Sequence, residues 1–370
     1  MSKKSVVFFS ISAVLLVVAL LLWQAGKINL SGWSLALFFL SLAFAFRGIR
    51  LLKGLSFTAI ILASVVLAMW HPEYFTTWGS FPLSSTIIPF IQLLMFGMGS
   101  SMSLNDFAAV VKSPKGVMIG VASQFIIMPL LGFTLSNVSN FPPEIAAGII
   151  LIGCSPSGLA SNVMAYLAKA NLALSITITS ITTLIAPFVT PLLMKLFAGA
   201  LIEIDVLKMM WDIFKMIIIP IGAGLLFNRL LKGKIQWLDK AMPVISMFAI
   251  TCIVTIIVAS GRDNLLKIGL LLIAIACVHN TLGYLLGYWS GRMFKLNEKD
   301  CRTIAIEVGM QNAGLASGIA KELGKIATIG LGAAVFGPLM NITGSALASW
   351  WHNRPPVDKT NENEMNHITK

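Results

Sequence analysis

"IAIEVGMQNAGLASGIAKE", residues 304–322, carries one carboxylate, Glu307, and then no further charge until Lys321. The residues around Glu307 are apolar, small or amide-bearing, as in a membrane-spanning helix. An ionisable group at membrane depth is costly, so it usually faces the interior of a helix bundle or a water-filled site. If the rest of the chain is embedded in a bilayer, this stretch predicts a functional position inside the fold.

The composition indicates that most of the chain is embedded in a bilayer. Of the 370 residues, 57% are hydrophobic and 11% are charged, and the mean hydropathy is +0.86. A soluble domain has about 25% charged residues. Runs of about 20 mainly apolar residues, the length that spans a bilayer, predict an all-α polytopic membrane protein. Twelve such runs lie at residues 6–26, 32–50, 55–71, 86–104, 116–136, 144–168, 172–194, 209–230, 241–260, 266–291, 303–320 and 326–351.

The positive charge is divided unequally across the predicted spans. On the side of both termini lie 19 of the 27 Lys and Arg residues, and 8 lie on the other side. Cytoplasmic loops carry the excess of basic residues in membrane proteins. We therefore expect a protein of the cell (inner) membrane with both termini in the cytoplasm. The net charge of +12 follows from this topology, so it implies no nucleic-acid partner, and no protein partner is implied either.

The two ends of the chain differ from its centre. The apolar stretch from Val6 to Trp23 has 18 residues and is followed by no A-x-A-type site, so we expect a retained span and not a signal peptide. Residues 1–54 then form two transmembrane helices, residues 55–354 the main transmembrane domain, and the polar residues 355–370 a disordered cytoplasmic tail. The four cysteines, Cys154, Cys252, Cys277 and Cys301, lack metal-ligand spacing and are expected to be buried thiols.

Polar clusters interrupt the apolar spans at "GCSPSGLASN" (153–162), at "SITIT" (175–179) and in the opening stretch. Pro156 cannot donate to the helix ladder, and Gly153 and Gly158 flank it. A broken helix in lipid is tolerated only where its free backbone groups line a cavity or bind something. We therefore predict a discontinuous helix at a binding site, and the alternative is a plain packing kink.

The broken segment has a counterpart in the second half of the chain. The tetrapeptide GLAS occurs twice, 156 residues apart, and the same offset aligns Gln124 with Asn280. The halves, about 55–200 and 209–351, contain five predicted spans each, so they insert with opposite orientation. Inverted five-helix repeats with broken helices at the midplane are typical of secondary transporters.

Over spans three to twelve, about 300 residues, the sequence resembles the bile acid:sodium symporter family. The motifs that carry the resemblance are "LLMFGMGSSMSLNDFAAVVKSPK" (93–115), "GCSPSGLASNVMAYLAKANLALSITITSITTLIAP" (153–187) and "EVGMQNAGLA" (307–316). The resemblance implies a ten-helix core, arranged as a panel domain and a core domain in which two broken helices cross. The first two predicted helices lie outside the family pattern, as additions to a bacterial-type member.

The resemblance also implies two sodium ions beside the crossing, and both would contact Glu307. One ion is expected at Ser161, Asn162, Ser175, Thr179 and Glu307, and the other at Gln124, Glu307, Gln311 and the backbone carbonyls of Val308 and Met310. The residue types suit this chemistry, because a hard cation prefers neutral and anionic oxygen ligands. Ser175 and Thr179, four residues apart, share one face of a helix.

Further residues are expected to bind the transported molecule. Two cations and one carboxylate leave one net positive charge, which an anionic substrate would neutralise. The N–H groups of Leu159 and Ala160 would open the half-helix after Pro156 and direct a positive dipole end toward a carboxylate. Asn312 matches a substrate residue of the family, and Asn341 stands where some bacterial relatives carry His. Leu159 departs from the family, since the motif here reads Cys-Ser-Pro-Ser-Gly-Leu where many relatives have Cys-Pro-Gly-Gly-Thr.

These patterns predict a secondary active transporter that imports an organic anion by sodium symport. The anion is expected to be bile-acid-like or a small carboxylate such as a keto acid or pantoate. Sodium is the one metal expected, and the anion and membrane lipid are the expected partners. Alternatives are a proton-coupled transporter or a cation/proton exchanger that uses Glu307, and a sodium sensor without transport. An intramembrane enzyme is disfavoured, because the spans hold no Asp pair, no H-E-x-x-H and no Ser–His arrangement, only His279.

Overall fold

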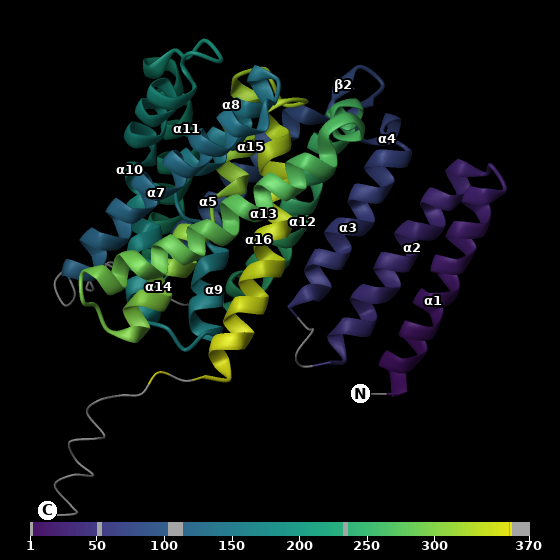
Figure 1. Cartoon of the computed structure of the whole chain (residues 1–370), viewed down its shortest axis with the longest axis horizontal. Helices are drawn as coiled ribbons and strands as arrows, with labels where there is room; N and C mark the ends of the chain where they lie inside the picture. The colour runs from purple at the N-terminus through teal and green to yellow at the C-terminus, as the bar shows by residue number, and fades with distance from the viewer. Residues whose placement is uncertain (1–2, 50–53, 103–113, 232–235, 355, 357–370) are drawn as a thin grey trace, which may run out of the picture.

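The computed structural model of the protein describes residues 3–49, 54–102, 114–231, 236–354 and 356. In this part of the chain nearly all regular structure is α-helical, and two short strands form a small hairpin (Figure 1). The predicted tail 355–370, apart from residue 356, and part of the motif at 93–115 lie outside the described residues.

The elements follow one another along the chain with short connections. The first half contains α1 (Lys3–Gln24), α2 (Ile28–Arg47), α3 (Leu55–Trp70), α4 (Glu73–Thr76), β1 (Thr77–Trp78), β2 (Phe81–Pro82), η1 (Leu83–Thr86), α5 (Ile87–Ser101), α7 (Pro114–Ser139), α8 (Pro143–Cys154), α9 (Ala160–Leu167) and α10 (Leu172–Ala198). The second half contains α11 (Val206–Leu231), α12 (Gln236–Ser260), α13 (Arg262–Met293), α14 (Glu298–Gly309), α15 (Ala313–Glu322) and α16 (Ile329–His352).

Within the described residues, nine helices are long and apolar enough to cross a membrane. The other three predicted spans are shorter or interrupted. α3 has 16 residues, α8 and α9 divide the predicted span 144–168, and α14 and α15 divide the predicted span 303–320. The start of α1 and the end of α16 lie on the same side of the bundle (Figure 1). The prediction of an all-α polytopic membrane protein is confirmed, and the division into two inverted repeats stays a prediction.

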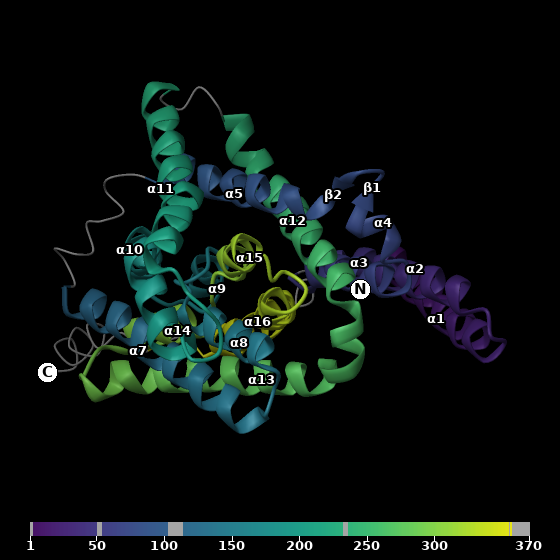
Figure 2. The same cartoon turned by 90° about the horizontal axis from the view of Figure 1, so that it is seen from above.

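The helices after α2 form two groups. The panel consists of α3, α5, α11 and α12, and the core bundle consists of α7 to α10 and α13 to α16. Seen from above, α8, α9, α15 and α16 lie inside a frame made by α5, α11, α12 and α13 (Figure 2). The half-helix α15 contacts α5, α11 and α12, so the second broken helix lies against the panel.

The first two helices extend the panel at one edge, where α1 packs on α2 and α2 packs on α3 (Figures 1 and 2). Buried serines join them: Ser34 Oγ donates to Leu15 O and Ser41 Oγ donates to Phe8 O, both at 2.9 Å. Large apolar side chains are exposed along the rest of α1, which suits contact with lipid. The two added helices therefore stand apart from the core bundle.

Two glycines allow the backbones of α8 and α16 to approach each other inside the core bundle. A Cβ atom at Gly332 would lie 2.6 Å from Gly148 O, and one at Gly148 would lie 2.5 Å from Ile329 O. Both distances are too short for a side chain, so small residues are required on both helices. This contact fixes α16 against the first broken helix.

We expect Gly148→Ala to destabilise the protein by about 1–3 kcal/mol, because an added methyl group overpacks this contact. The measurement is the thermal unfolding of the purified protein in detergent. Gly222→Ala on α11 is the matched control, since a Cβ atom there would meet nothing within 4 Å. The control should unfold at the wild-type temperature or slightly above it, because Ala favours a helix over Gly by about 1 kcal/mol. An equal loss in both variants would contradict the packing argument.

Candidate functional site

The two broken helices meet at their breaks through backbone hydrogen bonds. Ser157 and Gln311 pair as an isolated antiparallel bridge. The hydrogen bonds run from Gly158 N to Met310 O and from Asn312 N to Pro156 O, both at 2.8 Å. A Cβ atom at Gly158 would lie 2.6 Å from Gln311 O, so a glycine is needed for this approach. Each break supplies backbone partners that the other needs in the interior of a membrane.

Side-chain amides from two neighbouring helices bind carbonyl groups that the breaks leave free. Gln124 on α7 donates to Ser155 O at 2.9 Å, and Asn280 on α13 donates to Gly309 O at 2.8 Å. Thr343 Oγ1 on α16 donates to the other side of the Asn280 amide at 2.5 Å. Three continuous helices therefore support the crossing.

Glu307 lies at the crossing, fully buried, and four hydroxyl groups surround its carboxylate. Oε1 accepts from Ser161 Oγ at 2.6 Å and Ser175 Oγ at 2.5 Å, and Oε2 accepts from Ser157 Oγ at 2.6 Å and Thr179 Oγ1 at 2.7 Å. Arg302, five residues earlier, pairs instead with Glu298 at 2.8 Å. Arg302 is therefore engaged by Glu298, and the hydrogen-bond partners of the Glu307 carboxylate are hydroxyl groups.

Asn162 completes the first predicted group of sodium ligands. Its Oδ1 lies 2.8 Å from Ser175 Oγ and 3.3 Å from Thr179 Oγ1. Ser161 Oγ and Thr179 Oγ1 are 3.3 Å apart. The structure thus gathers residues of α9, α10 and α14 into one continuous cluster of oxygen atoms around Glu307, and their role as sodium ligands stays a prediction.

The second predicted group lies around the break between α14 and α15. Gln124 Nε2 donates to Gln311 Oε1 at 2.8 Å, and Gln311 Nε2 donates to Val308 O at 2.6 Å. Gln124 Oε1 is buried and has no hydrogen-bond partner among the described residues. A buried amide oxygen without a partner is unusual in a folded protein. It lies where the second cation is expected.

The chemistry of both groups suits a hard cation. Among the described residues, no group of three or more His, Cys, Asp or Glu could hold a metal ion. The donors that assemble here are hydroxyl, amide and carbonyl oxygens around one carboxylate, which are ligands that hard cations accept. Each hydroxyl that donates to Glu307 keeps lone pairs with which it could bind a cation.

A cavity of about 450 Å³ lies beside the crossing, between the panel and the core bundle. Its wall includes all four residues expected to bind substrate: Leu159, Ala160, Asn312 and Asn341. The half-helix α9 begins at Ala160, and its first turn has no side-chain cap. Asn312 Oδ1 caps α15 by accepting from Leu315 N at 3.0 Å. The wall is otherwise largely apolar, and no Lys, Arg, Asp or Glu of the described residues lines it.

Three further residues of the site, Ser157, Asn280 and Thr343, were not predicted from the sequence. Ser157 touches the carboxylate of Glu307 directly, and the Thr343–Asn280 pair holds a carbonyl of the break. The position of Ser157 between Pro156 and Gly158 was a signal for it. The offset that aligns Asn280 with Gln124 was a second signal. No feature of the sequence distinguishes Thr343 from other membrane threonines.

Comparison with known proteins agrees with this site. The profile described as the Sodium Bile acid symporter family matches residues 88–268. The uncharacterized sodium-dependent transporter YocS of Bacillus subtilis is 38% identical over 309 residues, which are 83% of this chain and 94% of that protein. The probable sodium/metabolite cotransporter BASS1 of Oryza sativa subsp. japonica is 33% identical over 83% of this chain and 74% of its own. The probable sodium/metabolite cotransporter BASS5 of Arabidopsis thaliana is 31% identical over 80% of this chain and 74% of its own.

The match to the relative from Bacillus subtilis covers nearly all of that protein and most of this chain. These relatives are sodium-coupled transporters and not enzymes, and the many apolar helices agree with a multi-pass membrane protein. The chain therefore belongs to the sodium bile acid symporter family, in which sodium is the coupling ion.

Proposed function

We propose that this protein imports an organic anion into the cell by secondary active transport coupled to sodium. The observation that carries the proposal is the environment of Glu307, whose carboxylate is held by four hydroxyl groups at the crossing of two broken helices. One buried carboxylate surrounded by neutral oxygen atoms suits the binding of monovalent cations. The adjacent cavity of about 450 Å³ offers room for a second solute.

Two sodium ions bind per cycle in this proposal, and they share Glu307. The first takes the cluster of Ser161, Asn162, Ser175 and Thr179, whose oxygens lie within hydrogen-bond distance of each other. The second takes Gln124, Gln311 and the carbonyls of Val308 and Met310. Support for the second site comes from Gln124 Oε1, the buried oxygen without a partner among the described residues.

The substrate is a monoanion in this proposal, either bile-acid-like or a small carboxylate such as a keto acid or pantoate. The described wall of the cavity carries no charged side chain, so it offers no Lys or Arg to pair with a second negative charge. The uncapped first turn of α9, at Leu159 and Ala160, offers backbone N–H groups to one carboxylate. The amides of Asn312 and Asn341 would complete its binding.

Glu307→Ala should abolish saturable sodium binding, because it removes the formal charge that both ions share. Ser175→Ala and Thr179→Ala should each lower the affinity for one of the two sodium ions by less than about tenfold, since one neutral contact contributes about 1 kcal/mol. The measurement is the binding of radioactive sodium to the purified protein, together with sodium-dependent uptake in proteoliposomes.

Glu322→Gln is the matched control, because Glu322 is an exposed acidic residue at the end of α15. It should bind sodium as the wild type does. If Glu307→Ala keeps the wild-type sodium dependence of uptake, the shared carboxylate is refuted. Uptake that follows external pH in sodium-free buffer would favour proton coupling through Glu307.

The chain is placed in the cell (inner) membrane in this proposal, with both termini in the cytoplasm, because 19 of the 27 basic residues lie on that side of the predicted spans. Reporters fused to either terminus should therefore report a cytoplasmic location. A reporter inserted at Gly79, in the turn between β1 and β2, should report the opposite side. Opposite locations for the two termini would refute the even number of crossings.

Transport should be electrogenic. Two sodium ions that enter with one monoanion carry one net positive charge inward, and a charge that crosses the full potential gains about 2.3 kcal/mol per 100 mV. An inside-negative potassium diffusion potential should therefore stimulate uptake into proteoliposomes at a fixed sodium gradient. If the uptake of a known monoanion does not change with the imposed potential, the stoichiometry of two sodium ions to one substrate is excluded, and with it one of the two sodium sites.

A further inference from the structure

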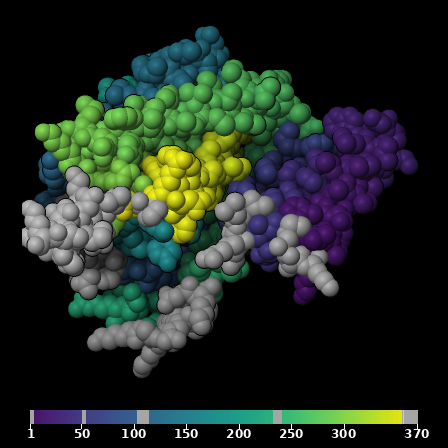
Figure 3. Space-filling view, turned by 60° about the horizontal axis from the view of Figure 1, so that its bottom comes forward, coloured from purple at the N-terminus to yellow at the C-terminus, as the bar shows by residue number. Residues whose placement is uncertain are grey.

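A second cavity, of about 720 Å³, lies at the surface of the core bundle. It is a groove between α13 and α16, which lie side by side on this face (Figure 3). One wall is a stripe of α13 residues spaced three and four apart: Thr281, Tyr284, Leu285, Tyr288 and Trp289. The other is a matching stripe of α16: Thr343, Ala346, Leu347, Trp350 and Trp351. We call this cavity the α13–α16 groove.

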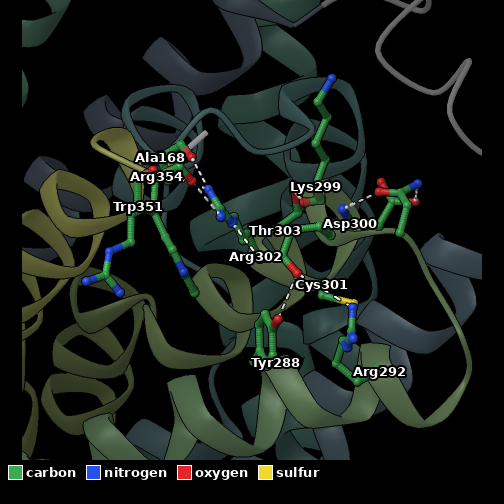
Figure 4. A network of polar contacts seen from close by, with 12 residues as sticks. Ala168, Tyr288, Arg292, Lys299, Asp300, Cys301, Arg302, Thr303, Trp351 and Arg354 are labelled. Carbon is green, nitrogen blue, oxygen red and sulfur yellow. Dashed lines mark hydrogen bonds and ion pairs between the residues drawn. The ribbon is translucent and has the colours of Figure 1, made fainter. Parts of the chain in front are cut away.

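The lower end of the groove is bordered by a network around Arg302, which is almost fully buried (Figure 4). The Arg302 guanidinium donates to Glu298 at 2.8 Å, to Trp351 O at 3.2 Å and to Arg354 O at 2.8 Å. It also lies over the Trp351 ring, 5.5 Å from the centroid. Arg302 therefore ties the start of α14 to the end of α16, and its donors are engaged inside the protein.

Arg354 stands at the mouth of the groove and is engaged differently. Its backbone is held by Arg302, but its side chain is exposed and lies over the Trp350 ring, 4.6 Å from the centroid. Among the described residues, the Arg354 side chain forms no ion pair. The nearby carboxylate of Glu298 pairs with Arg302 at 2.8 Å and with Arg292 at 3.7 Å. Of the described residues that line the groove, Glu298, Arg302 and Arg354 are charged, and together they carry a net positive charge.

The groove above Arg354 is aromatic and apolar. Trp289 and Trp350 are each about half exposed, at 55% and 50%, on opposite walls. Tryptophan and tyrosine are enriched where a protein meets the membrane–water interface. From Trp351 to Thr343 the helix rises by about 12 Å, at 1.5 Å per residue. A basic mouth with an apolar channel of this length matches a lipid that has an anionic headgroup and acyl chains.

We infer that the α13–α16 groove binds an anionic phospholipid, with the phosphate at Arg354 and an acyl chain between the Trp289 and Trp350 walls. Basic pockets between helices at the membrane surface recognise such headgroups, with about 1 kcal/mol for each Lys or Arg. The apolar walls favour a lipid over a soluble anion, since a soluble anion would leave them exposed to water.

The bound lipid would reach the residues that support the crossing. Thr343 lines the upper part of the groove, and its hydroxyl holds Asn280, which in turn donates to Gly309 O at the break of the second broken helix. Tyr284, also in the wall, places its hydroxyl 3.4 Å from Thr343 Oγ1. An acyl chain in the groove would therefore pack against Thr343 and Tyr284, which belong to the group of residues that supports the crossing at Glu307. The α13–α16 groove is separate from the substrate cavity, so lipid binding there does not depend on the identity of the substrate.

The test uses the full-length protein in phosphatidylcholine vesicles with a small fraction of brominated phosphatidylglycerol, whose bromine atoms quench tryptophan fluorescence on contact. The wild type should be quenched more strongly by brominated phosphatidylglycerol than by brominated phosphatidylcholine, and the difference should saturate. In Arg354→Gln the half-saturating fraction should rise about fivefold, which corresponds to about 1 kcal/mol. Arg354→Lys should keep most of the preference.

Arg47→Gln is the matched control. Arg47 also stacks on an aromatic ring, with its guanidinium 5.3 Å from the Phe44 centroid, but it lies at the end of α2 and not in the groove. Arg47→Gln should leave the preference unchanged. The inference is overturned if both lipids quench the wild type equally, or if Arg47→Gln weakens the preference as much as Arg354→Gln. It is also overturned if free glycerol phosphate abolishes the preference, since the groove would then take a soluble anion.

Discussion

The backbone bridge between the two broken helices is the interaction on which the rest of the structure depends. An unpaired N–H or C=O group in the interior of a membrane is too costly to leave exposed to lipid. Gly158 N and Asn312 N therefore find their acceptors in the opposite break, and Gln124 and Asn280 bind carbonyls that remain. Because each break satisfies the other, the two half-helices α9 and α15 begin at the same place. Both help to line one cavity, which is why a binding site can form there.

The crossing also decides the environment of Glu307. A carboxylate in a dry interior must be stabilised by hydrogen bonds or by cations, and here four hydroxyl groups from three segments supply the hydrogen bonds. A fully satisfied polar network of this kind is rigid. Cations that enter would take over the carboxylate oxygens, and the hydroxyl groups could turn their lone pairs toward them. Sodium binding and the geometry of the crossing are therefore expected to depend on each other. The α13–α16 groove lies next to the crossing, because Thr343 lines the groove and holds Asn280.

Much of the candidate site could be predicted from the sequence, for identifiable reasons. Glu307 is conspicuous as a charge among apolar residues, and Pro156 marks the break because it cannot donate to the helix ladder. Ser175 and Thr179 lie on one face of α10 through their spacing, and the structure directs both to the same carboxylate. Thr343 could not be recognised, because most Ser and Thr residues in membrane helices bond only their own backbone. Its importance arises from contact with Asn280, 63 residues away in the chain.

The sequence by itself determined that the chain lies in a membrane, where its spans begin and end within a few residues, and where two of them break. These properties follow from hydrophobicity and from proline and glycine, which act within one segment. Only the tertiary structure decided that Ser157 and Gln311 pair with each other, that Arg302 is occupied by Glu298 and not by Glu307, and that a basic mouth forms at Arg354. Such contacts join segments that are distant in the chain. Their partners are set by how the helices pack, because only packing decides which buried polar group can reach another.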